Sequence, residues 1–193
     1  IGDKEGIQNI CDIHNYNIAG LRIIHEPDTD KSVEMAVRMV SSKQADILMK
    51  GKIGTSTLLK CVLNKEWGLR TGNLLSHFAL FEVETYHKVI AVTDVAMNIA
   101  PNLQEKIAIV NNSVACLNRL GYTMPKVAVL GAVEMVNENM EATLDAALLS
   151  KMNQRDQIRN CIIDGPLAFD NAISLESAQH KGIRSEVAGD TDL

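Results

Sequence analysis

This sequence of 193 residues has few aromatic residues and no excess of positive charge. Phe, Trp and Tyr together make up 4% of it, and the formal net charge at pH 7 is -5. Domains that bind nucleic acids usually carry a basic face and aromatic side chains that stack on bases. The composition therefore argues against a nucleic-acid partner.

Long apolar runs and paired cysteines are also missing. No apolar run reaches the roughly 18 residues that a membrane-spanning helix requires. The four cysteines lie far apart without a C-x-x-C pair, which is typical of free thiols in a reducing compartment. We therefore expect no membrane association and a cytoplasmic location. The five histidines show no metal-ligand spacing, so no metal site is expected either.

Helical and strand-like patterns alternate along the chain, with short polar connections between them. Strands are expected at residues 21–24, 46–49, 126–130 and 160–164. Helices are expected after Asp3, Asp30 and Thr55, from residues 101–102 to Gly121, and after Thr143. This alternation favours an α/β fold, in which α/β/α layers enclose mostly parallel sheets.

The middle of the chain has a different pattern. Two apolar runs, at residues 76–83 and 88–93, are separated by only a few residues, which is too short for a crossover helix. They should form an antiparallel hairpin. Because the layering changes at this point, we expect two lobes around a cleft, formed by residues 1–85 and 86–193.

The segment KGKIGTS at residues 50–56 is the first candidate site. It forms a turn from a predicted strand into a helix, and unpaired N–H groups at a helix start attract anions. Its order of residues differs from that of a Walker A loop. Candidate phosphate or coenzyme ligands are Lys50, Gly51, Gly54, Thr55 and Ser56. The alternative is a tight turn in which Thr55 only caps the helix.

Arg70 and Ser76 are the next candidates. Arg70 lies in a Gly-Leu-Arg-Thr-Gly loop, and a guanidinium can hold a phosphoryl group through two parallel hydrogen bonds. Alternatively, it is a solvated surface charge. Ser76 precedes the first hairpin strand, where its hydroxyl could donate to a phosphate oxygen or simply begin the strand.

Polar residues also follow buried strands, where α/β clefts collect their ligand contacts. Asn98 comes after the second hairpin strand together with Asp94, and it could bind a ligand or cap the next helix. Asp164 ends the last predicted strand, and Asp170 follows shortly after. Two such carboxylates could act as acid and base or bind a cation. Structural capping is an equally good explanation.

Four strings in a fixed order carry a family resemblance. They are the tract GLRTGNLLSHFALFEVETYHKVIAVTDVAMNIAP at residues 68–101, DGPLAFDNAIS at 164–174, and KGI with VAGD at 181–190. Together they resemble the phosphate acetyl/butyryltransferase family, and within it the phosphate butyryltransferase (branched-chain phosphotransacylase) branch. The resemblance covers essentially all 193 residues.

This resemblance implies an acyltransferase that moves a butyryl or branched-chain acyl group between coenzyme A and inorganic phosphate. It implies a homodimer or higher homo-oligomer, no cofactor beyond these substrates, and an architecture similar to isocitrate and isopropylmalate dehydrogenases. It also implies that Arg70 is the substrate-anion arginine. Family members are longer at both ends, and their catalytic base lies beyond the position of Leu193, so we expect a fragment that lacks this base.

Two alternatives remain open from the residues. A metal- and NAD-dependent decarboxylating dehydrogenase would share the two-lobe architecture, but it needs a cluster of metal-binding aspartates and a lysine–tyrosine pair. Only Asp164 and Asp170 suit such a cluster, and no tyrosine fits. The other alternative is a non-catalytic module that binds coenzyme A or phosphate.

Overall fold

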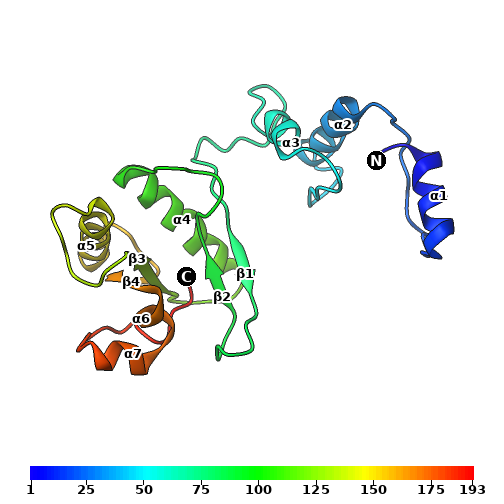
Figure 1. Ribbon diagram of the computed structural model, residues 1–193. Helices are drawn as coiled ribbons and strands as arrows, with labels where there is room; N and C mark the ends of the chain where they lie inside the picture. Colours follow the sequence, from blue (N-terminus) through cyan, green and yellow to red (C-terminus); the bar gives the residue numbers. More distant parts are fainter. The chain divides into compact units, whose positions relative to one another are not determined.

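The computed structural model describes residues 1–193 and shows a mixed α/β chain with seven helices and four short strands (Figure 1). The chain divides into two compact units, Ile1–Asn73 and Leu74–Leu193. This division lies before the hairpin, whereas the two lobes expected from the sequence, 1–85 and 86–193, stay a prediction. None of the helices is both long enough and apolar enough to cross a membrane.

The first unit is built from three helices, as the sequence predicted: α1 (Lys4–His14), α2 (Thr29–Ser41) and α3 (Thr55–Val62). Aspartates cap the first two of them. Asp3 accepts a hydrogen bond from the Gly6 N–H at 3.3 Å, and Asp28 accepts one from the Lys31 N–H at 2.9 Å. Such caps satisfy N–H groups that have no partner within the helix. Helices α2 and α3 pack side by side (Figure 1).

Two strands predicted in this unit are absent, and the prediction is wrong there. Residues 21–24 and 46–49 belong to no strand, and one isolated bridge joins Gly2 to His25. An apolar pattern alone does not make a strand, because a strand also needs a neighbour that hydrogen-bonds to its backbone and covers its side chains. Ile47 is 83% exposed and Met49 is 88% exposed in this structure.

The second unit begins with the predicted hairpin, which is confirmed. Strands β1 (Ala79–Phe81) and β2 (Ile90–Val92) pair antiparallel, with Ala79 opposite Val92 and Phe81 opposite Ile90. Both strands are shorter than the apolar runs that predicted them.

A parallel strand pair follows. Strands β3 (Lys126–Leu130) and β4 (Ile162–Leu167) lie side by side, and α5 (Glu141–Gln154) connects them and packs on both. The chain therefore contains one parallel and one antiparallel strand pair, so the parallel pairing expected from the sequence is found in the β3–β4 pair, whereas β1 and β2 are antiparallel. Helix α5 starts earlier than predicted. Thr143 is buried within its first turn, where its hydroxyl donates a hydrogen bond to the Asn137 carbonyl.

The main core lies between α4 (Leu103–Arg119), α5 and the strands. Asn102 and Glu105 form a reciprocal capping box at the start of α4. Its buried side includes Val110, Val114 and Leu117, which pack with residues from β2, β3, β4 and α5. Two short helices, α6 (Phe169–Ile173) and α7 (Leu175–His180), pack into a second apolar cluster.

Residues 192–193 join the two strand pairs. The Ala91 N–H of β2 donates to the Asp192 carbonyl at 2.7 Å, and the Ala128 N–H of β3 donates to the Leu193 carbonyl at 2.8 Å. The Leu193 N–H in turn donates to the Lys126 carbonyl at 3.1 Å, which is the pattern of a parallel pair. Figure 1 shows the C-terminus between the two pairs.

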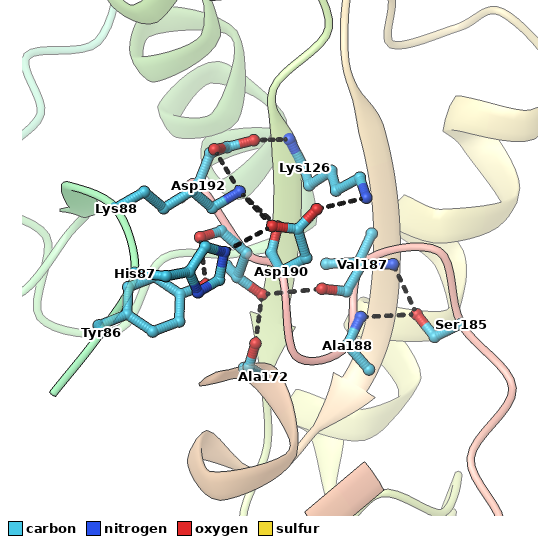
Figure 2. A network of polar contacts seen from close by, with 11 residues as sticks. Tyr86, His87, Lys88, Lys126, Ala172, Ser185, Val187, Ala188, Asp190 and Asp192 are labelled. Carbon is cyan, nitrogen blue, oxygen red and sulfur yellow. Dashed lines mark hydrogen bonds and ion pairs between the residues drawn. The ribbon is translucent and has the colours of Figure 1, made fainter. Parts of the chain in front are cut away.

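A cluster of charged side chains holds residues 190–192 to the loop between β1 and β2 (Figure 2). Asp190 accepts hydrogen bonds from Lys126 at 2.7 Å, Lys88 at 2.8 Å and His87 at 2.9 Å. Lys88 also pairs with Asp192 at 2.8 Å. The bonds from Lys126, Lys88 and His87 hold the pKa of the Asp190 carboxyl far below its usual range. Asp190 therefore stays ionised across the ordinary pH range.

Replacing Asp190 by Asn should lower the free energy of unfolding by about 1 kcal/mol at pH 7, because the carboxylate is partly exposed and its ion pairs are screened. Since the pKa is depressed in the folded state, this contribution is fully present above the unfolded value of about 3.9 and is lost progressively as the pH falls from there through the folded pKa. Urea unfolding at pH 7 measures the full difference between wild type and variant, and unfolding at about pH 3 shows the start of its decline. Glu186→Gln, which removes an exposed charge from the same loop, is the control. Equal losses in the two variants would contradict the expectation.

Candidate anion-binding residues

The turn before α3 presents unpaired backbone N–H groups. Gly54 is the N-cap of this helix, and no side chain accepts a hydrogen bond from the first-turn amides. The positive end of the helix dipole adds to the attraction for an anion. Gly54, Thr55 and Ser56 are exposed, so a ligand can reach these groups.

Lys50 lies against the same loop. Its Nζ donates to the Ile53 carbonyl at 3.0 Å and to the Gly51 carbonyl at 3.3 Å. The ammonium thereby stabilises the loop and adds positive charge near the start of α3. Lys50 and Gly51 also line a hollow of about 700 Å³ within the first unit, beside α2.

Arg70 follows a loop fixed to the other end of α3. The Leu69 N–H donates to the Val62 carbonyl at 2.8 Å, and the Gly68 N–H donates to the Asn64 carbonyl at 3.2 Å. A Cβ on Gly68 would lie 2.5 Å from both of these carbonyl oxygens, so the close approach requires glycine. Arg70 is exposed. An eight-residue helix, about 12 Å long, separates this loop from Gly54.

In the second unit, side chains hold residues 74–77, which we name the clamped segment. The Asn112 Nδ2 donates to the Leu74 carbonyl at 2.8 Å and to the Ser76 Oγ at 3.0 Å. The Asn98 Nδ2 donates to the Leu75 carbonyl at 3.1 Å. The Thr93 hydroxyl donates to the carbonyl of His77 at 2.5 Å. Side chains from the loop after β2 and from α4 thus fix this segment, which lies just before strand β1.

Asp94 fixes the turn that follows β2. Its carboxylate accepts the Met97 N–H at 2.9 Å, the Ala96 N–H at 3.1 Å and the Asn98 side-chain amide at 2.5 Å. Burial alone would raise the pKa of Asp94, but these hydrogen bonds outweigh it and lower the pKa. Asn98 therefore donates both amide hydrogens within the chain, which leaves its carbonyl oxygen for a ligand.

A mostly apolar hollow of about 330 Å³ adjoins this turn. Thr93 and Asp94 line it from the end of β2, and Lys106 lines it from α4. Lys106 forms an ion pair at 2.5 Å with Asp145, whose side chain is 9% exposed. Sequence reasoning missed Lys106 and Asn112, because no local motif marks a polar residue on a helix as facing a distant loop.

Asp164, on β4, does not line this hollow. It stands opposite Ala128 of β3, and its Oδ1 accepts the Gly165 N–H at 2.8 Å. A Cβ on Gly165 would lie 2.5 Å from the Val129 carbonyl oxygen. The Asp-Gly-Pro string thus has a structural role in bringing two strands together. No group of three or more His, Cys, Asp or Glu side chains is arranged to hold a metal ion.

Comparison with known proteins gives consistent matches. The family profile described as "Phosphate acetyl/butaryl transferase" matches residues 7–193. A phosphate butyryltransferase of Clostridium acetobutylicum is 48% identical over 193 residues, which is all of this chain and 64% of that protein. A phosphate acetyltransferase of Thermotoga maritima is 44% identical over 164 residues, covering 85% of this chain and 56% of that protein.

A solved structure is also similar. The branched-chain phosphotransacylase from Enterococcus faecalis V583 matches with a TM-score of 0.80 and 36% identity, covering 88% of this chain and 60% of that one. The chain thus spans less than two thirds of the length of these relatives.

Proposed function

Because the chain belongs to the phosphate acetyl/butaryl transferase family, we propose that it transfers a butyryl or branched-chain acyl group between coenzyme A and inorganic phosphate. The reaction is acyl-CoA plus phosphate to acyl phosphate plus coenzyme A. The observation that carries this proposal is the 48% identity to a phosphate butyryltransferase along the whole chain. The comparisons do not favour a decarboxylating dehydrogenase.

Turnover with butyryl-CoA and phosphate tests this function directly. Loss of the thioester and formation of butyryl phosphate, both dependent on added phosphate, are the expected results. Isobutyryl-CoA and acetyl-CoA, compared at equal concentrations, report the acyl preference. Tight binding of coenzyme A without turnover would instead support a non-catalytic module, and reduction of NAD would support a dehydrogenase.

Binding of the phosphoryl group is the part of the reaction that this chain is equipped to perform. The exposed amides of Gly54, Thr55 and Ser56, with the ammonium of Lys50 beside them, suit an anion. The Arg70 guanidinium and the Ser76 hydroxyl provide further donors. Gly51 belongs to the same turn as Lys50, and Asn98 and Asp164 complete the proposed set of ligand contacts.

Chemically, these donors would act on the charge that develops as the acyl group moves. The coenzyme thiol, with an ordinary pKa of about 8.5, attacks the acyl phosphate as its thiolate, and phosphate leaves. Donors placed around the departing phosphate and the carbonyl oxygen stabilise that transition state more than the bound substrate. No residue of this chain is proposed as the base that removes the thiol proton.

Titration with inorganic phosphate should locate the anion. We expect the amide NMR resonances of Thr55 and Ser56 to shift with saturation, because their N–H groups have no side-chain acceptor. Replacing Lys50 by Met should weaken phosphate binding by a factor of about two to five, the effect of one exposed charge near a helix start. Unchanged shifts at saturating phosphate would leave the turn as a structural cap only.

The wider context is also part of the proposal. We place the enzyme in the cytoplasm as a homodimer or higher homo-oligomer, with acyl-CoA and phosphate as its partners and no other cofactor. We also propose a two-lobe arrangement around a cleft, similar to that of isocitrate and isopropylmalate dehydrogenases. The TM-score of 0.80 to a branched-chain phosphotransacylase supports the family fold.

A further inference from the structure

The clamped segment contains a serine whose hydrogen-bonding direction is set by a neighbour. We propose that Asn112 is a positioning residue that orients the Ser76 hydroxyl as a donor to the phosphoryl group of the substrate. This inference rests on the proposed function and extends it to a residue of α4.

The direction of the hydrogen bond follows from its chemistry. An amide Nδ2 can only donate, so Ser76 Oγ accepts from Asn112 at 3.0 Å. A hydroxyl has one hydrogen and two acceptor lone pairs. Because Asn112 uses an acceptor site of Ser76, the single hydroxyl hydrogen remains for another partner, and no group of the chain accepts it. An acceptor-rich dianion such as phosphate suits that hydrogen.

Asn112 is itself held in place. Its side-chain amide also donates a hydrogen bond to the Leu74 carbonyl at 2.8 Å. Both amide hydrogens of Asn112 therefore bind the clamped segment. The next two residues of α4, Ser113 and Val114, are buried, so the helix is packed against the core at this point. Asn98 fixes the intervening Leu75 carbonyl at 3.1 Å. The bond from Asn112 therefore limits the positions open to the hydroxyl hydrogen before any ligand binds, which lowers the entropy lost on binding.

A double-mutant cycle tests this role. The Ser76→Ala and Asn112→Ala variants of the full protein should each raise the KM for inorganic phosphate by about tenfold, which is the effect of losing one hydrogen bond. The double variant should be no worse than the worse single one, because Asn112 acts through Ser76. The KM for butyryl-CoA should stay within about twofold in all three.

Asn118→Ala is the matched control. Asn118 lies on the same helix, and its amide also donates to a backbone carbonyl, that of Tyr122, at 2.7 Å. This variant should lose thermal stability to a similar extent as Asn112→Ala but keep the wild-type KM for phosphate. If the Asn112 and Ser76 effects are additive, or if Asn112→Ala lowers only stability, the positioning role is wrong. If the wild type shows no phosphate-dependent turnover, the proposed function is overturned, and this role with it.

Discussion

Arg70→Ala is expected to lower kcat/KM for phosphate by about 10- to 150-fold. A hydrogen bond to a charged group contributes about 1.5–3 kcal/mol, and each 1.4 kcal/mol corresponds to a factor of ten. The exposed guanidinium stands on a loop fixed by the close approach of Gly68 to Val62 and Asn64. Its loss should therefore remove a ligand contact without disturbing the first unit. Initial rates at varied phosphate measure the effect.

Two further variants show what Arg70 contributes. Arg70→Lys keeps the charge but loses the planar fork, so it should recover only part of the activity. Arg155→Ala removes an exposed arginine at the end of α5 and should leave kcat/KM near the wild-type value. If Arg70→Ala retains full activity, Arg70 is a solvated surface charge, the alternative that the sequence left open.

Gly165→Ala is expected to destabilise the second unit by about 3 kcal/mol, the upper end of the usual cost of overpacking. The new Cβ would lie 2.5 Å from the Val129 carbonyl oxygen, 3.0 Å from the Val129 Cβ and 3.3 Å from the Ala146 Cβ. Backbone atoms of a packed strand cannot move aside as a flexible side chain can. Urea unfolding followed by circular dichroism measures the loss.

The stability control is Gly51→Ala, because a Cβ there meets nothing within 4 Å. It should change the unfolding midpoint only slightly. The result also separates two interpretations of the Asp-Gly-Pro string. A variant at Gly165 that keeps normal stability but loses activity would show that the string contacts substrate and does not merely join strands β3 and β4.

The sequence predicted the elements whose signals are local. The start of α4 near Asn102 and the residue range of β3 both follow from nearby residues. The hairpin was also predictable, because two apolar runs so close together leave no room for a crossover. The family was predictable from strings whose order is specific, and the profile match confirms it.

The remaining features depend on contacts between distant residues. The runs at 21–24 and 46–49 have the pattern of strands, yet no strand pairs with them. Asn112 lies 38 positions from Leu74 and 36 from Ser76, so no window of sequence reveals the clamp. For the candidate anion-binding residues, the residue types indicated that they can bind phosphate. Their grouping around one substrate stays a prediction.

The joining of β2 to residues 192–193 has a kinetic consequence. The cluster around Asp190 links side chains 103 positions apart, from His87 to Asp190. Contacts between such distant positions form late, because a long loop must close before any interaction compensates for the lost entropy. Until then Ala91, which is 1% exposed in the final structure, faces solvent on an unpaired strand edge. The hairpin is therefore the region where we expect a folding intermediate to aggregate, and where a chaperone would protect it most.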